Sequence, residues 1–447
     1  MPFPSSPTNG QTYVLNNTSY TYDSAQGTWT ATQAGVSTPI VIAANTAATS
    51  TGTGALQVVG GIGVQGNVYA ANVGFADGSV FGTVQSFGSR NRIINGDFKI
   101  DQRNGGANVA VSTTGGVYYI DRWTWNNTTN LQSKGYTGFN QNNIISPTGF
   151  FSYLGWTTTT VPSTLTAGDY LFLSQKIEGY NVRDLGYGQS WARNAVLSFW
   201  TRSSNAGVYS GFLRNNPTFN LSYTFTYNIP TANTWTYVSI PVPGVTSGTW
   251  GGGNGCGLEL GFAVWNGNNF ATTTSNVWTG TNLTGANSLA LSGNVLTAVG
   301  SNMQWTGVQF EPGSVPTPYE LRPITIETAL CARYYYTSNT NVSGTSREWV
   351  WITYTANGDT RGRVNHPVQM RSPPSITFNT TSWNMIGVGT STTTPYAPVN
   401  VSMTSVTATA ISVDAWSITT AAIASQGTSL VWGSNQGINV YADAEIG

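Results

Sequence analysis

Two stretches, SYTFTYNI at residues 222–229 and GLELGFAVW at residues 257–265, decide the fold class. In each stretch a large apolar or aromatic side chain occupies every second position. Successive side chains of a β-strand point to opposite faces, so a period of two predicts strands with one buried face. The alternating residues are Tyr223, Phe225 and Tyr227 in the first stretch and Leu258, Leu260, Phe262 and Val264 in the second.

The same pattern continues on both sides of these stretches. AVLSFW at residues 195–200 and YVSIPV at residues 237–242 alternate in the same way. Turn sequences separate the strands, as in NNP at 215–217 and GGGN at 251–254. Many short strands with one buried face predict an all-β fold, and here they indicate a two-sheet sandwich over residues 89–325.

The composition excludes several classes of partner. Only 8% of the 447 residues are charged, and 17 basic residues balance 17 acidic ones. A chain without net charge has no field that attracts nucleic acid or an anionic membrane, so we expect neither partner. Aromatic residues make up 12% of the chain, which indicates packed cores rather than disorder.

The chain carries no recognisable export or membrane signal. The N-terminal sequence MPFPSSPTNGQ has neither a basic nor an apolar signal region, and no apolar run is long enough to span a bilayer. We therefore expect synthesis in a cytoplasm and no membrane insertion. The two cysteines, Cys256 and Cys331, are too few for a disulfide framework, and we expect both to be buried.

Two smaller parts precede the sandwich. Residues 1–35 alternate aromatic and polar side chains around Asn16-Asn17, which predicts an N-terminal β-hairpin module too short to bury a core alone. Residues 36–88 are repetitive and rich in glycine, with apolar pairs such as Leu56 and Val58. Such stripes gain stability only from neighbours, which favours a β-shaft made by three identical chains; the alternative is a flexible linker.

One part follows the sandwich. IETALCARYYY at residues 326–336 predicts a helix with Ile326, Leu330 and Tyr334 near one face. Strand patterns follow it up to the final GINVYADAEIG. Residues 326–447 are therefore expected to form a helix-led C-terminal β-domain, in which the helix caps the sandwich and the last strands lie in a distal unit.

Two segments carry a resemblance to a known family. They are NRIINGDFKIDQRNGGANVAVSTTGGVYYIDRW at residues 91–123 and QFEPGSVPTPYELRPITIETALCARYYY at residues 309–336. Together with SQKIEGYNVRDL at residues 174–185, in this order and spacing, they resemble the carbohydrate-binding-like jelly-roll domain of bacteriophage tail fibres and other virion appendages.

The resemblance implies a homotrimeric structural protein of the virion, on a tail or neck appendage. It implies that residues 1–35 attach to other tail, neck or baseplate proteins and that the outer β-domains recognise a glycan on the host surface during adsorption. The alternatives are a purely structural neck or baseplate fibre without glycan binding and a polysaccharide depolymerase spike. A secreted cellular carbohydrate-binding protein is disfavoured because no signal peptide is seen.

Catalytic and metal chemistry find little support in the sequence. The single histidine, His366, precedes a proline and lacks a nucleophile motif, and one histidine with two distant cysteines cannot build a metal cluster. The NGDF segment at residues 95–98 resembles the start of jelly-rolls with a structural calcium, but Lys99 follows where an acid would help hold the ion. We expect no enzyme, no cofactor and no metal.

Five tryptophans are the candidate carbohydrate-binding residues. A sugar ring packs its apolar side on an exposed aromatic face, beside polar groups that bind its hydroxyls. The alternative for each tryptophan is a place in the core or in a trimer interface. The candidates are Trp265, which has the opposite parity to the Leu258–Val264 stripe, Trp156 in YLGWTTTT, Trp250 in a glycine-rich loop, Trp278 in TTTSNVWTGTN, and Trp383 in a polar loop of the C-terminal domain.

Overall fold

The fold is described from a computed structural model of the chain, which divides into two compact units, residues 1–69 and 70–447. The structure describes residues 3–15, 18–32, 72–74, 80–82, 89–110, 115–128, 135–139, 147–162, 164–216, 218–286, 291–337, 350–354, 359–378, 382–387, 399–408, 412–418, 430–432 and 440–446. The two units are considered separately below.

The N-terminal unit contains one antiparallel sheet of β1 (Thr12–Leu15), β2 (Thr18–Asp23) and β3 (Thr28–Thr32). Leu15 pairs with Thr18, which confirms the predicted hairpin around residues 16–17. The ring of Phe3 stacks on Trp29 at 5.3 Å and meets Tyr20 edge-on at 5.0 Å. A few aromatic rings thus take the place of a larger core.

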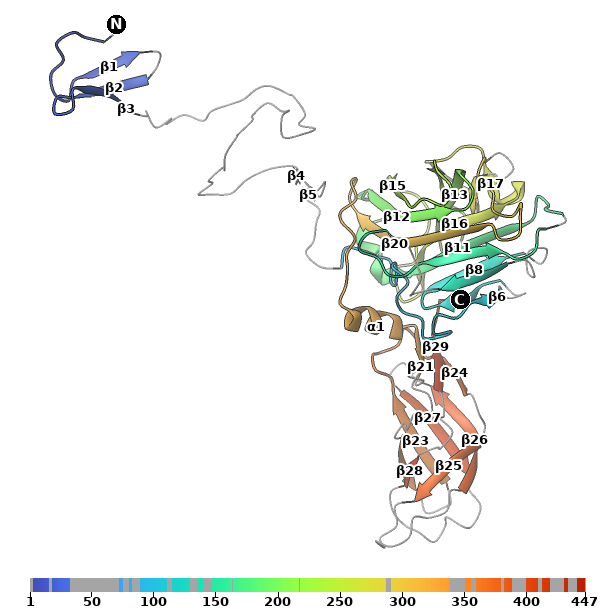
Figure 1. The fold of residues 1–447 in the computed structure, drawn as a ribbon. Helices are drawn as coiled ribbons and strands as arrows, with labels where there is room; N and C mark the ends of the chain where they lie inside the picture. Colours follow the sequence, from blue (N-terminus) through green and yellow to red (C-terminus); the bar gives the residue numbers. More distant parts are fainter. Residues whose placement is uncertain are drawn as a thin grey trace. The chain divides into compact units, whose positions relative to one another are not determined.

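The predicted all-β sandwich is confirmed (Figure 1). One sheet has six strands in the order β15 (Thr236–Val242), β12 (Ala195–Ser203), β20 (Asn302–Pro312), β10 (Leu154–Thr158), β9 (Gly135–Phe139) and β6 (Val109–Ala110). The other has seven, in the order β18 (Trp278–Thr279), β14 (Ser222–Ile229), β13 (Gly207–Asn215), β16 (Cys256–Asn266), β11 (Tyr170–Glu178), β8 (Trp123–Asn127) and β7 (Val117–Ile120). Two short strands, β17 (Ala271–Thr272) and β19 (Gly285–Ala286), pair in parallel beside them.

The core between the two sheets is built around large aromatic side chains. Trp123, Trp125, Trp156 and Trp305 are each at most 1% exposed. Trp125 contacts both Trp156 and Trp305, with ring centroids 5.3 and 6.2 Å apart. Burial of such rings is the main term that stabilises the sandwich, since each removes a large apolar area from water.

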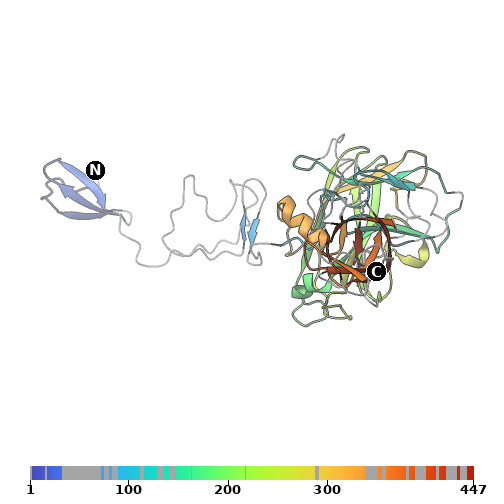
Figure 2. The same ribbon diagram turned by 90° about the horizontal axis from the view of Figure 1, so that it is seen from below.

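The predicted helix exists as α1 (Ile324–Ala332; Figure 2), and only part of the predicted face packs inward, since Leu330 and Tyr334 join a buried cluster and Ile326 does not. Ile326 is 51% exposed, whereas Glu327 and Cys331 are buried. Glu327 turns inward because it accepts a hydrogen bond from the backbone N–H of Asn95 and pairs with Arg322 at 3.4 Å. The helix is therefore fixed to the sandwich by polar contacts that an apolar pattern does not reveal, together with the apolar cluster that Cys331 forms with Ile94 and Ile100.

The C-terminal region contains a closed barrel in the order β22 (Val350–Tyr354), β23 (Asp359–Asn365), β27 (Ser412–Ile418), β26 (Val399–Ala408), β25 (Ser382–Gly387) and β28 (Leu430–Trp432). The final strand, expected in the distal unit, is not one of the barrel strands. β29 (Val440–Asp443) lies outside the barrel, between β21 (Tyr335–Thr337) and β24 (Ser375–Phe378). The barrel strands are thus inserted between β21 and β29.

The residues after β29, here called the tail (residues 444–446), contact the sandwich. Glu445 forms a buried ion pair with Arg122 and a second pair with Arg103 at 3.3 Å. The hydroxyl of Tyr118 donates a hydrogen bond to the carbonyl oxygen of Ile446 at 2.8 Å. Burial of these charges requires their mutual pairing, so the tail and the sandwich stabilise each other.

The segment predicted as a trimeric shaft is described only in part. β4 (Asn72–Gly74) and β5 (Val80–Gly82) pair as an antiparallel hairpin, and the rest of residues 36–88 lies outside the described residues. The trimer and the domain boundaries at residues 35, 88 and 325 stay predictions. In the part of the chain that the structure describes, no helix is long and apolar enough to cross a membrane.

Candidate functional site

Two of the candidate tryptophans come together at one edge of the sandwich. The rings of Trp250 and Trp278 meet edge-on with centroids 5.5 Å apart. Tyr187 contacts both, at 5.1 Å from Trp250 and 5.8 Å from Trp278. Trp278 also packs on the buried Tyr223 at 5.4 Å, which connects this aromatic cluster to the core.

The local backbone fixes the two indoles. Trp278 lies on the short edge strand β18, and its Nε1 donates a hydrogen bond to the carbonyl of Pro243 at 2.8 Å. Trp250 lies in the loop before β16, and its Nε1 donates to the carbonyl of Ser247 at 3.0 Å. Both indole N–H groups are thus satisfied by the protein, so these rings offer a ligand their apolar surface.

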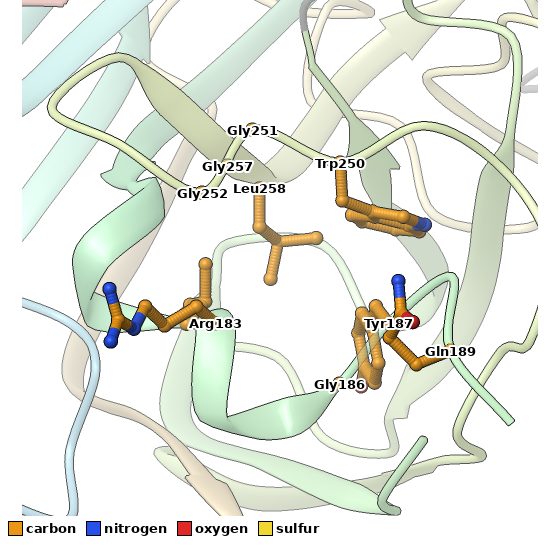
Figure 3. Close-up of a pocket in the computed structure, with 10 residues that line it drawn as sticks. Arg183, Gly186, Tyr187, Gln189, Trp250, Gly251, Gly252, Gly257 and Leu258 are labelled. Atoms are coloured by element: carbon orange, nitrogen blue, oxygen red, sulfur yellow. The ribbon is translucent and has the colours of Figure 1, made fainter. Parts of the chain in front are cut away.

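A pocket of about 170 Å³ opens beside this cluster (Figure 3). Its walls include the rings of Tyr187 and Trp250, and the apolar side chain of Leu258 lies between them and Arg183. Gln189 lines the same pocket beside Tyr187. We call this feature the edge pocket; it combines aromatic walls with an amide and a guanidinium.

One aromatic residue beside the edge pocket was not predicted. Trp191 is 54% exposed, and its ring lies directly over Gly186, where a Cβ atom would be 2.3 Å from two ring carbons. Gly186 has a φ of +64°, a conformation that favours glycine. The signal in the sequence is GYGQSW at residues 186–191, where glycines precede a tryptophan in a loop.

Polar groups in the edge pocket keep unused bonding capacity. The hydroxyl of Tyr187 is buried and has no hydrogen-bond partner among the described residues. Burial raises the pKa of Tyr187, so the phenol stays protonated and can donate. Arg183 forms no ion pair with any described carboxylate. The neighbouring Asp184 pairs instead with Arg92 at 2.6 Å. A buried donor without a partner is costly, which favours a site completed by a ligand or water.

Two other candidates do not belong to a site. Trp156 was expected in a polar segment, but it lies on β10 with 0% exposure, and its Nε1 donates to Thr158 Oγ1 at 3.1 Å. Trp265 was expected to face away from the core, but it is 3% exposed and packs in the core. The reason is an irregularity in the pairing of β16 with β11: Trp265 pairs with Leu171, whereas Ala263 pairs with the next residue, Phe172. Val264 is thus an extra residue on β16 at this step, and it places Trp265 on the face opposite to the one that simple alternation predicts.

Trp383 was expected in a loop, and the structure instead places it on β25, where it pairs with Val401 of β26. The position of its side chain lies outside the described features, so its role as a candidate stays a prediction. The sequence could not separate strand from loop here because SWNMIG has no clear alternation.

The charged residues elsewhere in the sandwich are held in structural contacts. Glu178 pairs with Arg333 at 2.6 Å and accepts a hydrogen bond from Tyr334 at 2.6 Å. Glu259 pairs with Arg214 at 2.7 Å. Within the described residues, no three His, Cys, Asp or Glu side chains lie close enough together to hold a metal ion.

The comparisons with known proteins give no family. No protein-family model matches the sequence. No curated protein matches it either. Among solved structures, the enzymatically active domain of bacteriophage CBA120 tailspike protein 4 aligns at 12% identity and a TM-score of 0.25, over 50% of this chain and 22% of that chain.

Carbohydrate-binding modules align at a similar level. A family 61 module solved with β-1,4-galactotriose aligns at 9% identity and a TM-score of 0.25, and a family 4 module at 14% and 0.24; each alignment covers 50% of this chain and 100% of the module. Similarity this weak carries no conclusion about function.

Proposed function

We propose that this protein is a structural component of a phage appendage that recognises a glycan on the host surface, and that the edge pocket binds that glycan. The observation that carries the proposal is the edge pocket itself, where Tyr187 and Trp250 form aromatic walls beside Arg183 and Gln189. The place on a virion rests on the sequence resemblance of residues 91–123 and 309–336.

The chemistry of the edge pocket suits a sugar. Sugar rings have an apolar side that packs on aromatic faces and hydroxyls that need donors and acceptors. Trp191 offers an exposed indole at the rim, and Gln189 offers both a donor and an acceptor. On the glycine-rich rim, Gly252 has open space where a Cβ atom would lie, which leaves room for a ligand to approach the backbone there.

Adhesion does not require tight binding at one site. If three chains assemble, three edge pockets act together and raise the overall affinity by orders of magnitude without any new contact. The protein is proposed to act by binding alone, without catalysis. A second candidate, cleavage of the bound polysaccharide, would need two carboxylates flanking the scissile bond.

The test uses purified full-length protein and cells of candidate host bacteria. We expect saturable binding that is lost after periodate treatment of the cell-surface glycans. Trp191→Ala and Gln189→Ala should each weaken binding about tenfold or more, because a well-placed side chain at a binding site contributes at least this much. Leu321→Ala, at a residue that is 67% exposed outside the edge pocket, is the matched control and should bind normally.

Four results would contradict the proposal. Binding that survives periodate would exclude a glycan receptor. Equal binding by Trp191→Ala, Gln189→Ala and the Leu321→Ala control would exclude the edge pocket. Release of reducing sugar during incubation would favour the depolymerase, and absence of binding to every host tested would favour a purely structural fibre.

A further inference from the structure

The outer face of the six-stranded sheet carries a second aromatic surface, away from the edge pocket. Trp200 on β12 and Tyr237 on β15 pair directly across the sheet, and their rings lie 5.3 Å apart. Tyr153, just before β10, and Trp235, just before β15, meet at 6.1 Å. We call these four residues, with Arg202 and Gln304, the sheet face.

These side chains point away from the core. On β12 the alternate residues Leu197 and Phe199 are buried in the core, so Trp200 and Arg202 lie on the opposite side. Tyr237 is 45% exposed. The strand pairing brings Arg202 opposite Gln304, and Gln304 opposite Gly155 of β10, so the surface continues across four strands.

Arg202 is held rigidly in the middle of this surface. Its Nε donates to the carbonyl of Asn233 at 2.9 Å, Nη2 donates to Asn233 Oδ1 at 3.1 Å, and Nη1 donates to Gln304 Oε1 at 3.0 Å. A guanidinium has five N–H donors, so two stay available. No described carboxylate forms an ion pair with Arg202, although most arginines of the sandwich have one.

From this arrangement we propose that the sheet face is a second glycan-binding site, which takes an extended oligosaccharide across the strands. This inference rests on the proposed function, since it assumes that the protein binds glycans, but it assigns a separate site and a longer ligand. The aromatic rings stack on successive sugar rings, and Arg202 donates to their oxygens. Strand spacing of about 4.8 Å makes the surface roughly 14 Å wide from β15 to β10.

A protein partner is the competing occupant, because Trp, Tyr and Arg also dominate protein interfaces. The sheet face favours the glycan because its members are aromatic or polar, with no aliphatic side chain among them. An interface core of ordinary size also needs many more residues than this surface offers.

The experiment measures binding of the full chain to linear oligosaccharides of increasing length, drawn from surface polysaccharides of the host. We expect affinity to rise with length, and Tyr237→Ala and Arg202→Gln to weaken binding of long oligosaccharides about tenfold while short ones bind as before. Trp191→Ala beside the edge pocket should do the reverse and weaken binding of the shortest ligands. Thermal unfolding of each variant checks that the fold is retained.

The outcomes separate the two sites. If Tyr237→Ala and Arg202→Gln bind long oligosaccharides normally while Trp191→Ala does not, the proposal for the sheet face is wrong and the proposal for the edge pocket is supported. If only the sheet-face variants lose binding, the edge pocket is wrong. Self-association that Tyr237→Ala abolishes, without any effect on glycan binding, would assign the sheet face to a second copy of this chain and overturn the proposal.

Discussion

Gly186 shows how one residue without a side chain shapes the edge pocket. Its φ of +64° turns the chain so that Trp191 folds back over it, and a Cβ atom there would overlap the indole.

Asp121 acts differently, through a buried charge. It is 0% exposed and accepts two hydrogen bonds from Gln102, at 2.7 and 2.6 Å.

Gly186→Ala should displace Trp191 and strain the backbone. We expect the free energy of unfolding to fall by about 1–2 kcal/mol from the left-handed conformation alone, together with weaker glycan binding. Urea unfolding and binding measurements check this. The control is Gly255→Ala, outside the lining of the edge pocket, where a Cβ atom meets nothing within 4 Å. Equal effects of the two substitutions would show that Trp191 is not held by Gly186.

Asp121 predicts a pH dependence of stability. Burial raises the pKa of Asp121 to about 7, although Arg103 and the Gln102 hydrogen bonds lower it. An unfolded aspartate has a pKa of about 3.9. Between these two values the folded state binds more protons than the unfolded state, so the contribution to stability falls as the pH rises from about 4 to about 7.

The measurement is the free energy of urea unfolding across that pH range. Asp121→Asn, which has the shape of the protonated acid, should flatten the fall. Asp184→Asn, at a residue whose side chain is 44% exposed, is the control and should leave the slope unchanged. A slope that is the same in Asp121→Asn and the native chain would assign the pH dependence to another group.

At the scale of the element, β16 explains why one prediction from the sequence was right and another was wrong. Its alternation from Leu258 to Phe262 correctly predicts a strand, although all eleven residues of β16 are buried and not only one face. The irregular pairing near Val264 then shifts the register, and Trp265 enters the core. A bulge leaves no mark in the hydrophobic pattern, so parity alone assigns Trp265 to the wrong side.

Trp265→Ala should therefore behave as a core substitution. We expect a loss of about 3–5 kcal/mol in the free energy of unfolding, since a buried aromatic side chain leaves a cavity. Trp191→Ala, at an exposed tryptophan, should cost less than about 1 kcal/mol. Thermal and urea unfolding compare the two variants, and similar losses would mean that Trp265 is not buried as described.

The sequence predicted more of the fold than of the site. The sandwich, the N-terminal hairpin and helix α1 follow from hydrophobic residues that repeat with a period of two or of 3.6 residues. The edge pocket could not be predicted in this way. It brings residues 182–191 next to residues 250–258 through turns, and turns have no periodic hydrophobic pattern. Of the five candidates, Trp250 borders the edge pocket and Trp278 supports it. Trp191 was missed because its exposure depends on the turn at Gly186.

At the scale of the whole chain, the tail is the connection that matters most. Arg122 is 1% exposed and its partner Glu445 is 323 residues away in sequence. Glu445→Gln should lower the free energy of unfolding of the sandwich by about 3–5 kcal/mol, because it leaves a buried guanidinium without its counter-charge. Asp443→Asn, which removes the charge of a partly exposed partner of Arg103 and keeps an oxygen that can accept from the Glu445 N–H, is the control and should cost much less.

The position of Glu445 also bears on synthesis. A ribosome adds about 5–20 residues per second, so Arg122 emerges many seconds before the residue that neutralises it. During that interval the sandwich cannot complete its charge pairing, and a chain that stops early never completes it. Ribosomes that fail in the barrel would therefore release a destabilised product that cellular proteases remove, whereas chains that include Glu445 would persist.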